Sequence, residues 1–185
     1  MSDSPFDENP KFRFEPLDTK KHDRAAFSCG KDSLDKYLKE YAAQDIKKRV
    51  AAVYVLTPDG KTIAGYYTLS QYSIEADEFP PELVQQLRLP KYDKLPATLL
   101  GRLARSQAFR GAGIGELLLM GALTKALEHS RNVASIAVVV DAIDETARAF
   151  YSSYGFIEVP GLPNRLFIPM KTVAQLFPNV VFRQS

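Results

Sequence analysis

The chain has 185 residues, of which 45% are hydrophobic, so it can bury one substantial core. Its net charge of +2 lacks the marked basic excess that is typical of nucleic-acid-binding proteins. One cysteine and two histidines exclude an internal disulfide and a histidine- or cysteine-rich metal cluster, and no apolar run reaches the ~18 residues of a membrane span. We expect a soluble, cytoplasmic protein with a polar tail over residues 1–10 and a single domain over residues 11–185.

The first half of the chain predicts a strand, a helix and a hairpin. Alternation over residues 11–16 indicates the strand. An amphipathic helix capped by Asp32 or Ser33 is indicated by apolar residues at i, i+3, i+4 and i+7, namely Leu34, Tyr37, Leu38 and Tyr41. Two β-branched and aromatic runs, residues 50–56 and 62–71, flank Pro58-Asp59-Gly60 and predict an antiparallel hairpin.

Helices and strands alternate in the second half. Three prolines around residues 78–92 leave room for a turn or two of helix inside a long excursion. Further strands are expected over residues 97–106, 133–141, 156–159 and 165–170, and helices over residues 115–130 and 144–154. This order predicts an α/β fold with a mixed, mostly antiparallel central sheet and helices on both faces.

The segment Arg110-Gly111-Ala112-Gly113-Ile114-Gly115 joins an apolar strand to a helix. N–H groups at a helix N-terminus have no intrahelical partner and can hold phosphate oxygens, and glycines let a phosphate approach the backbone. A glycine-lined packing turn explains the spacing equally well. The segment is neither a P-loop, because no Lys-Ser/Thr pair closes it, nor a G-x-G-x-x-G motif.

The spacing of Arg110, Gly113 and Gly115 resembles the acetyl-CoA pyrophosphate loop of the GNAT acetyltransferase superfamily. Downstream, the segment from Ala147 to Phe156 is similar to that superfamily's Ala-x-x-Phe-Tyr-x-x-x-Gly-Phe pattern. The two segments occur in the family's order, and the resemblance covers roughly residues 11–170. It implies a splayed strand pair that holds acetyl-CoA as co-substrate, without a metal.

The resemblance also implies roles for individual residues. Backbone groups of Leu103 and Arg105 would contact the pantetheine arm, and the pyrophosphate would be held by Arg110, Gly111, Gly113 and Gly115. Tyr151 occupies the position of the phenol that protonates the departing thiolate. We expect Phe150 and Tyr154 to pack in the core, which leaves Tyr151 for the cleft. Asp144 is assigned as a helix N-cap rather than to CoA.

A general base is harder to identify. The strand over residues 97–106 contains no carboxylate, although several family members place a glutamate there. Glu75, Glu78 or an ordered water could serve from the neighbouring segment. An α-amine, with a pKa near ~8, needs less help than a lysine side chain near ~10.4, which favours an α-amine acceptor.

Within the superfamily the chain resembles the acetyltransferase toxins of bacterial toxin-antitoxin pairs. The resemblance is carried by Phe27-Ser28-Cys29-Gly30, Gly65-Tyr66-Tyr67-Thr68-Leu69 and Leu99-Leu100-Gly101-Arg102-Leu103-Ala104. It implies acetylation of the α-amine of aminoacyl-tRNA, a block of translation, a ribbon-helix-helix antitoxin as partner, and a homodimer.

Two questions stay open on the sequence. Lys47-Lys48-Arg49 is either a solvated helix end or, with Arg102 and Arg105, a contact for tRNA phosphates. The function is either that of the toxins or that of an N-acetyltransferase for a small-molecule or protein amine. A catalytically silent acyl-CoA-binding module is a third reading.

Overall fold

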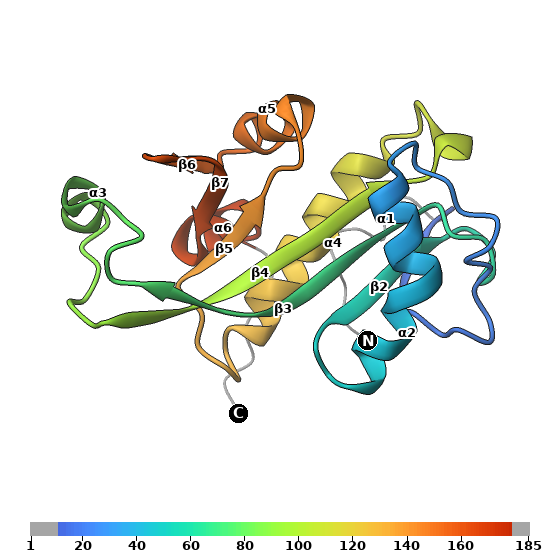
Figure 1. Cartoon of the computed structure of the whole chain (residues 1–185), viewed down its shortest axis with the longest axis horizontal. Coiled ribbons are helices and arrows are strands. Elements are labelled where there is room, and N and C mark those ends of the chain that lie inside the picture. Colours follow the sequence, from blue (N-terminus) through green and yellow to red (C-terminus); the bar gives the residue numbers. More distant parts are fainter. Residues whose placement is uncertain (1–10, 179–185) are drawn as a thin grey trace. The chain divides into compact units, whose positions relative to one another are not determined.

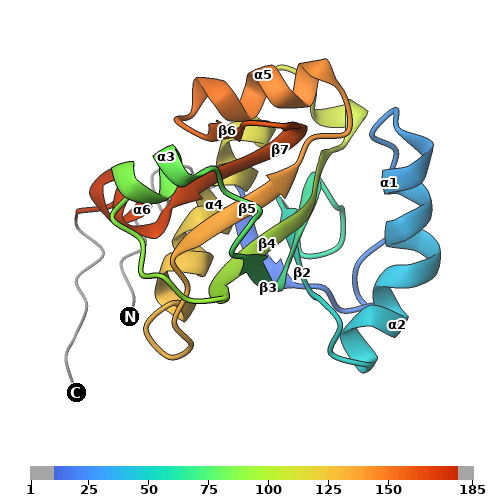
Figure 2. The same ribbon diagram turned by 60° about the vertical axis from the view of Figure 1, so that its left-hand side comes forward.

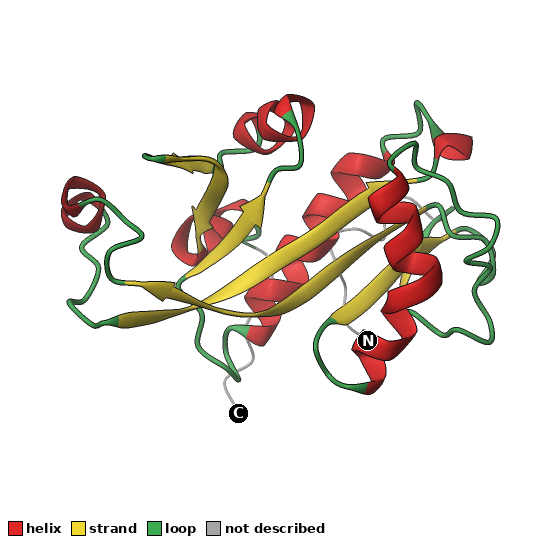
Figure 3. Cartoon of the chain, in the orientation of Figure 1, coloured by secondary structure: helices red, strands yellow, loops and turns green. Residues whose placement is uncertain are grey.

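The structure is a computed structural model that describes residues 11–178, so the predicted tail over residues 1–10 lies outside the described residues. Within the described range, seven strands form a sheet in the order β1-β2-β3-β4-β5-β7-β6 (Figures 1 and 3). The pairs β1–β2, β2–β3, β5–β7 and β6–β7 are antiparallel. The predicted mixed, mostly antiparallel α/β sheet is confirmed.

Most of the predicted strands and helices correspond to observed ones, whereas the helix over residues 170–176 was not predicted. The strands are β1 (Arg13–Pro16), β2 (Ala52–Thr57), β3 (Gly65–Glu75), β4 (Lys94–Arg105), β5 (Ala137–Asp141), β6 (Ile157–Val159) and β7 (Leu162–Pro169). The helices are α1 (Asp32–Lys36), the π-helical turn η1 (Tyr37–Tyr41), α2 (Ala42–Lys47), α3 (Pro81–Gln86), the 3-10 turn η2 (Gln107–Phe109), α4 (Ile114–His129), α5 (Glu145–Ser153) and α6 (Met170–Leu176). None of the helices in the described range is long and apolar enough to cross a bilayer.

The described chain forms two compact units. The first contains residues 11–70, 100–125 and 177–178, and the second contains residues 71–99 and 126–176. Strands β3 and β4 and helix α4 each contribute one part to the first unit and the rest to the second.

In the first unit, helices cover both faces of the sheet (Figures 1 and 2). Successive side chains of a strand point to opposite faces. Val53 and Val55 of β2 therefore pack in one cluster with Tyr37 and Leu38 of η1. The ring of Tyr54, between them, stacks on Tyr67 of β3 with 5.2 Å between ring centroids, and lies under the Nζ of Lys125 on α4.

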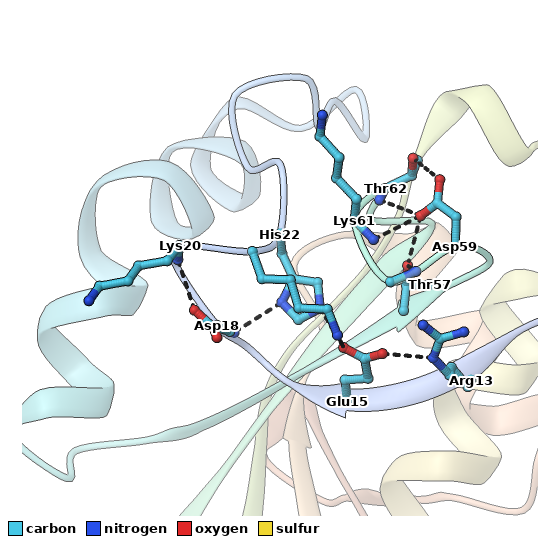
Figure 4. Close-up of polar contacts among 11 residues, drawn as sticks. Arg13, Glu15, Asp18, Lys20, His22, Thr57, Asp59, Lys61 and Thr62 are labelled. Carbon is cyan, nitrogen blue, oxygen red and sulfur yellow. Dashed lines mark hydrogen bonds and ion pairs between the residues drawn. The ribbon is translucent and has the colours of Figure 1, made fainter.

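The β2–β3 turn is held by Asp59 (Figure 4). Its carboxylate accepts hydrogen bonds from the backbone N–H groups of Lys61 at 2.8 Å and Thr62 at 2.7 Å. The Thr57 hydroxyl oxygen accepts from the Gly60 N–H at 2.9 Å. The hydrogen bonds to the Asp59 carboxylate lower its pKa, and the bond from the Thr62 hydroxyl is the largest cause, followed by the backbone N–H groups of Lys61 and Thr62. The predicted hairpin is confirmed, and its turn is an Asx-type structure encoded locally.

A second polar cluster surrounds Glu15 on β1 (Figure 4). The carboxylate accepts from Arg13 Nε and Lys21 Nζ, each at 2.7 Å, and lies 2.8 Å from Nε2 of the buried His22. His22 Nδ1 accepts the Asp18 N–H at 3.0 Å, which assigns the imidazole proton to Nε2. Lys21, followed by Arg13, lowers the pKa of Glu15 to about 2.

The first helical segment differs from its prediction in two ways. Lys31 is the N-cap of α1 and makes no side-chain capping bond, so the predicted cap at Asp32 or Ser33 is wrong. A π-helical turn separates α1 from α2. Tyr37 and Leu38 are buried as expected, whereas the side chain of Tyr41 is 48% exposed.

In the second unit, residues 137–140 of β5 and 166–168 of β7 are buried on both faces, as the unbroken apolar run of β5 indicates. One face packs Val139 and Phe167 against Phe79, whose ring centroid lies 4.7 Å from that of Phe167. On the other face Val138, Val140, Leu166 and Ile168 are almost fully buried. Helices α5 and α6 contact β7.

Candidate functional site

The glycine segment forms the connection from β4 to α4 in the first unit. Gly111 and Gly113 have φ angles of 82° and 70°, a left-handed conformation that favours glycine. A Cβ added at either position would meet no atom within 4 Å. The conformation therefore favours glycine at both positions, and the surface beside the backbone is open to an incoming group.

The same segment leads into the N-terminus of a long, well-anchored helix. The first bond of α4 runs from the Leu117 N–H to the Gly113 carbonyl at 3.1 Å. The N–H groups of Ile114, Gly115 and Glu116 therefore precede the intrahelical ladder, and the positive end of the helix dipole lies beside them. Ile114 is fully buried and fixes this end, while the Arg110 side chain is exposed. This arrangement can hold an oligophosphate.

Strand β4 leads directly into this loop and carries the two residues assigned to the pantetheine arm. Leu103 and Arg105 are half-buried and flank Ala104, which packs in the cluster with Tyr37. By strand alternation their side chains lie on the face opposite to Ala104. Their backbone role stays a prediction.

Tyr151 lies in the second unit, on α5. Its side chain is only 7% exposed and contacts the rings of Phe150 and Phe156, with centroid distances of 5.4 and 5.2 Å. The expectation that Phe150 and Tyr154 form the core pair is wrong: both are half-buried, and Tyr151 is the buried member of the three. Burial raises the pKa of the Tyr151 phenol, which stays protonated at neutral pH.

The helix that carries Tyr151 begins and ends as predicted. Asp144 is the N-cap of α5, and its carboxylate accepts the Ala147 N–H at 2.8 Å. Gly155 has a φ of 89° and ends the segment in the left-handed conformation. The predicted site residues thus divide between the units: the glycine segment and the two β4 residues belong to the first, and Tyr151 belongs to the second.

Comparison with known proteins places this geometry in a family. The model of the acetyltransferase (GNAT) domain matches residues 94–172. A probable toxin TacT from Sinorhizobium fredii is 35% identical over 170 residues, which cover 88% of this chain and 93% of the relative. A tRNA-acetylating toxin from Mycobacterium tuberculosis is 30% identical over 154 residues, which cover 83% of this chain and 90% of the relative. The chain belongs to the GNAT acetyltransferases.

Solved structures of the same family superpose over most of this acetyltransferase. AtaT complexed with acetyl-methionyl-tRNAfMet is 29% identical, with a TM-score of 0.80 and coverage of 90% of this chain and 99% of that one. A Tyr-to-Phe mutant of AtaT, bound to the C-terminus of the antitoxin AtaR and acetyl-CoA, is 27% identical. Its TM-score is 0.76, with coverage of 90% of this chain and 98% of that one.

The two glutamates considered as general bases of the acetyltransferase are engaged by neighbours. Glu78 accepts hydrogen bonds from the Tyr72 hydroxyl and from the Arg165 guanidinium, and its side chain is 9% exposed. Glu75 pairs with Lys94 at 3.3 Å. In this arrangement neither carboxylate is free to accept a proton from the amine.

Arg165 on β7 is a polar centre that the sequence patterns did not single out. Besides Glu78, it binds both oxygens of Asp141 at 2.8 and 2.9 Å, and its guanidinium lies over the ring of Tyr72. Asp141 is the largest cause of a raised pKa at Arg165. The sequence indicated a strand around Arg165 from its apolar neighbours. It did not indicate the polar contacts of Arg165, because their partners come from β3, β5 and the loop before α3.

The basic residues of the acetyltransferase occupy different settings. Lys47, Lys48 and Arg49 are exposed at the end of α2, where cations are favoured by the helix dipole. Arg102, on β4, is half-buried instead, and its Cζ lies 3.6 Å from the ring centroid of Tyr37.

Within the described residues, no group of three or more His, Cys, Asp and Glu side chains could hold a metal ion. Cys29 is half-buried, and its Sγ donates to the Lys31 carbonyl at 3.6 Å. Burial raises the pKa of its thiol to about 11, so it stays protonated at neutral pH. These observations favour a packing role for Cys29 over a nucleophilic one.

Proposed function

We propose that the chain is a toxin-type N-acetyltransferase that transfers the acetyl group of acetyl-CoA to the α-amine of aminoacyl-tRNA and thereby blocks translation. The observation that carries the proposal is near-full-length similarity to a tRNA-acetylating toxin and to AtaT in complex with acetyl-methionyl-tRNA. An N-acetylated α-amine cannot attack a peptidyl ester, so the product is inactive as an elongation substrate.

The donor substrate is assigned to the first unit. Gly111, Gly113 and Gly115, with the N-terminus of α4, would bind the pyrophosphate of acetyl-CoA, and the exposed Arg110 would add a charged donor. Backbone groups of Leu103 and Arg105 would pair with the pantetheine arm. The open space beside Gly111 and Gly113 supports this assignment.

In the proposed reaction, the neutral α-amine attacks the thioester carbonyl carbon. The C–N bond forms, the C–S bond breaks, and the electron pair of that bond leaves on sulfur. The amine loses one proton to water, and Tyr151 donates its phenolic proton to the thiolate. The buried phenol is in the protonated state that this role requires.

The choice of acceptor agrees with the lack of a free carboxylate among the candidate bases of the described residues. No carboxylate occurs between Ala97 and Ser106, and Glu75 and Glu78 are engaged by Lys94 and Arg165. An α-amine with a pKa near ~8 is partly neutral at physiological pH, whereas a lysine amine near ~10.4 is not. This difference favours an aminoacyl ester over a protein lysine.

The test is transfer of radiolabelled acetyl from acetyl-CoA to a bulk pool of aminoacylated tRNA, with deacylated tRNA as the blank. Tyr151→Phe keeps the ring and removes the proton donor. We expect label on charged tRNA only, and a turnover that is about 10²–10⁴-fold lower in Tyr151→Phe at unchanged acetyl-CoA affinity.

Three results would contradict the proposal. Robust acetylation of free amines or protein amines, with charged tRNA ignored, would assign an ordinary N-acetyltransferase. Tight acetyl-CoA binding without transfer to any offered amine would assign a silent binding module. Equal turnover of the wild type and Tyr151→Phe would remove Tyr151 from the reaction.

The same proposal extends to partners and location. We expect the chain to act in the cytoplasm, where charged tRNA is available. A ribbon-helix-helix antitoxin is expected to neutralise it, in line with the AtaR complex of AtaT. A homodimer also stays a prediction, and light scattering of the purified protein would measure it.

A further inference from the structure

The π-helical turn η1 places a tyrosine under a cation. A π-helical turn is rare, and such turns occur frequently at functional sites. Tyr37 is the first residue of η1 and is 4% exposed. Its hydroxyl donates to Asp45 on α2 at 2.9 Å, which fixes the ring.

The ring of Tyr37 is the outer member of an aromatic column. Phe27 contacts Tyr66 edge to face with 5.5 Å between centroids, and Tyr66 stacks on Tyr37 at 6.3 Å with an angle of 18° between the rings. The Tyr66 hydroxyl donates to the Leu34 carbonyl at 2.7 Å. Arg102 completes the column, with Cζ only 3.6 Å from the Tyr37 centroid. The guanidinium plane is therefore held by a rigid support.

The guanidinium of Arg102 has a stacking partner but no acceptor. Among residues 11–178 it makes no ion pair and no hydrogen bond. Three acidic side chains of the adjacent helical segments have other partners: Asp45 accepts from Tyr37, Asp35 accepts the Cys29 N–H at 2.9 Å, and Glu40 pairs with Lys36 at 3.9 Å. A guanidinium carries five N–H donors, and burial removes part of the water that would accept their hydrogen bonds. An anionic ligand can accept these bonds instead.

Arg102 also lies next to the donor-substrate residues in the chain. It precedes Leu103 and shares the side of β4 on which Ala104 packs with Tyr37. Leu103 and Arg105 occupy the other side by alternation. The loop that contains Cys29 lies beside the end of β4, because the Gln107 N–H donates to the Ser28 carbonyl at 2.8 Å. All of these residues belong to the first unit.

From this geometry we infer that Arg102, held over the ring of Tyr37, binds the unpaired nucleotides that carry the aminoacyl group. The N–H edge of the guanidinium donates to a phosphate of the RNA end, while Tyr37 keeps the plane oriented for a bidentate contact. The inference rests on the proposed function and makes Arg102 a positioning residue for the acceptor, separate from the helix-end cations Lys47, Lys48 and Arg49.

The experiment measures binding and turnover in parallel. Fluorescence anisotropy gives the Kd of deacylated bulk tRNA, calorimetry gives the Kd of acetyl-CoA, and the label assay gives KM and kcat for charged tRNA. Arg102→Gln removes the charge, and Arg102→Lys keeps the charge but lacks the planar fork. Arg49→Gln is the matched control, because it removes an exposed cation from the same unit.

We expect the tRNA Kd and the KM for charged tRNA to rise about tenfold or more in Arg102→Gln and several-fold in Arg102→Lys. Arg49→Gln should change both by less than about twofold, and acetyl-CoA affinity should stay at the wild-type value in all three. Tyr37→Leu, which removes the supporting ring, should weaken tRNA binding in the same direction. Thermal unfolding of each variant checks the fold.

Several outcomes would overturn the inference. Wild-type tRNA binding in a folded Arg102→Gln variant would remove Arg102 from the interface, and so would equal losses in Arg102→Gln and Arg49→Gln. Loss of acetyl-CoA affinity in Arg102→Gln would move the residue to the donor site. If the wild type binds tRNA through Arg102 but does not acetylate charged tRNA, the proposed function fails, and only the contact of Arg102 with tRNA stands. If the wild type binds no tRNA, both fail.

Discussion

Gly113 is a residue at which backbone conformation and anion binding coincide. Its φ of 70° excludes most side chains, and it immediately precedes the first residue of α4. A carboxylate placed there would lie beside the N–H groups assigned to the pyrophosphate. Substitutions at Gly113 can therefore separate the effect of side-chain charge on acetyl-CoA binding from the effect of side-chain shape.

We predict that Gly113→Asp weakens acetyl-CoA binding by about tenfold or more, because its anion repels the pyrophosphate. Gly113→Asn is the matched control, since asparagine has the same shape, tolerates the left-handed region and is neutral. It should weaken binding much less. Calorimetric titration with acetyl-CoA measures both, and equal affinities of the two variants would exclude a charge effect and remove the loop from the phosphate site.

At the scale of elements, α5 depends on its N-cap residue, Asp144. Asp144 satisfies the Ala147 N–H, and the short helix that follows carries Tyr151. A helix of nine residues is not stable alone, so its cap and its buried face both contribute to holding Tyr151 in place.

We predict that Asp144→Ala lowers the free energy of unfolding by about 1 kcal/mol, because the Ala147 N–H loses its acceptor. Asp144→Ser, which keeps a capping oxygen, should retain most of the stability. Urea unfolding followed by circular dichroism measures the difference. A stability of Asp144→Ala equal to that of the wild type would show that another group caps the helix.

The elements that could be predicted are those encoded by neighbouring residues. Pro58-Asp59-Gly60 forms its turn through bonds within a few residues, and the glycine segment adopts its left-handed angles for the same local reason. The π-helical turn was missed because apolar residues at i, i+3 and i+4 fit an α-helix equally well. The burial of Tyr151 was also misjudged, since it depends on Phe156 beyond the end of the helix.

In the candidate site, too, features encoded by neighbouring residues could be predicted, and those that depend on distant residues could not. The glycine segment and the Asp144 cap were visible as local patterns. Arg165 and the Tyr37–Arg102 stack were not, because their members are separated by tens of residues and meet only through strand pairing and helix packing. The role of Tyr151 came from the family resemblance and stays a prediction, although its burial agrees with a protonated phenol.

At the scale of the whole molecule, stability should depend on acidic pH through Glu15. Its pKa is lowered to about 2 in the folded state, compared with ~4.3 for a free glutamate. A lowered folded-state pKa adds stability above the unfolded-state value, and this contribution is lost as the pH falls from about 4 towards 2. Because Arg13 and Lys21 are exposed, solvent screening limits the gain.

We predict that Glu15→Gln lowers the free energy of unfolding by about 1 kcal/mol at pH 6, and that this difference shrinks by about half at pH 3. Urea unfolding of both proteins at the two pH values measures it. Glu158→Gln, which removes a more exposed carboxylate that pairs with Arg148, is the control and should show a smaller effect. A difference between the wild type and Glu15→Gln that is independent of pH would contradict the assignment.

The path of the chain between its two compact units limits how the molecule can be divided. The chain changes unit after residues 70, 99, 125 and 176, twice inside a strand and once inside α4. No single cleavage of the polypeptide can therefore release either unit as one continuous fragment. A protease that nicks the exposed loop at residues 90–93 leaves both resulting pieces with parts of both units, so these two fragments should regain activity only when they are mixed.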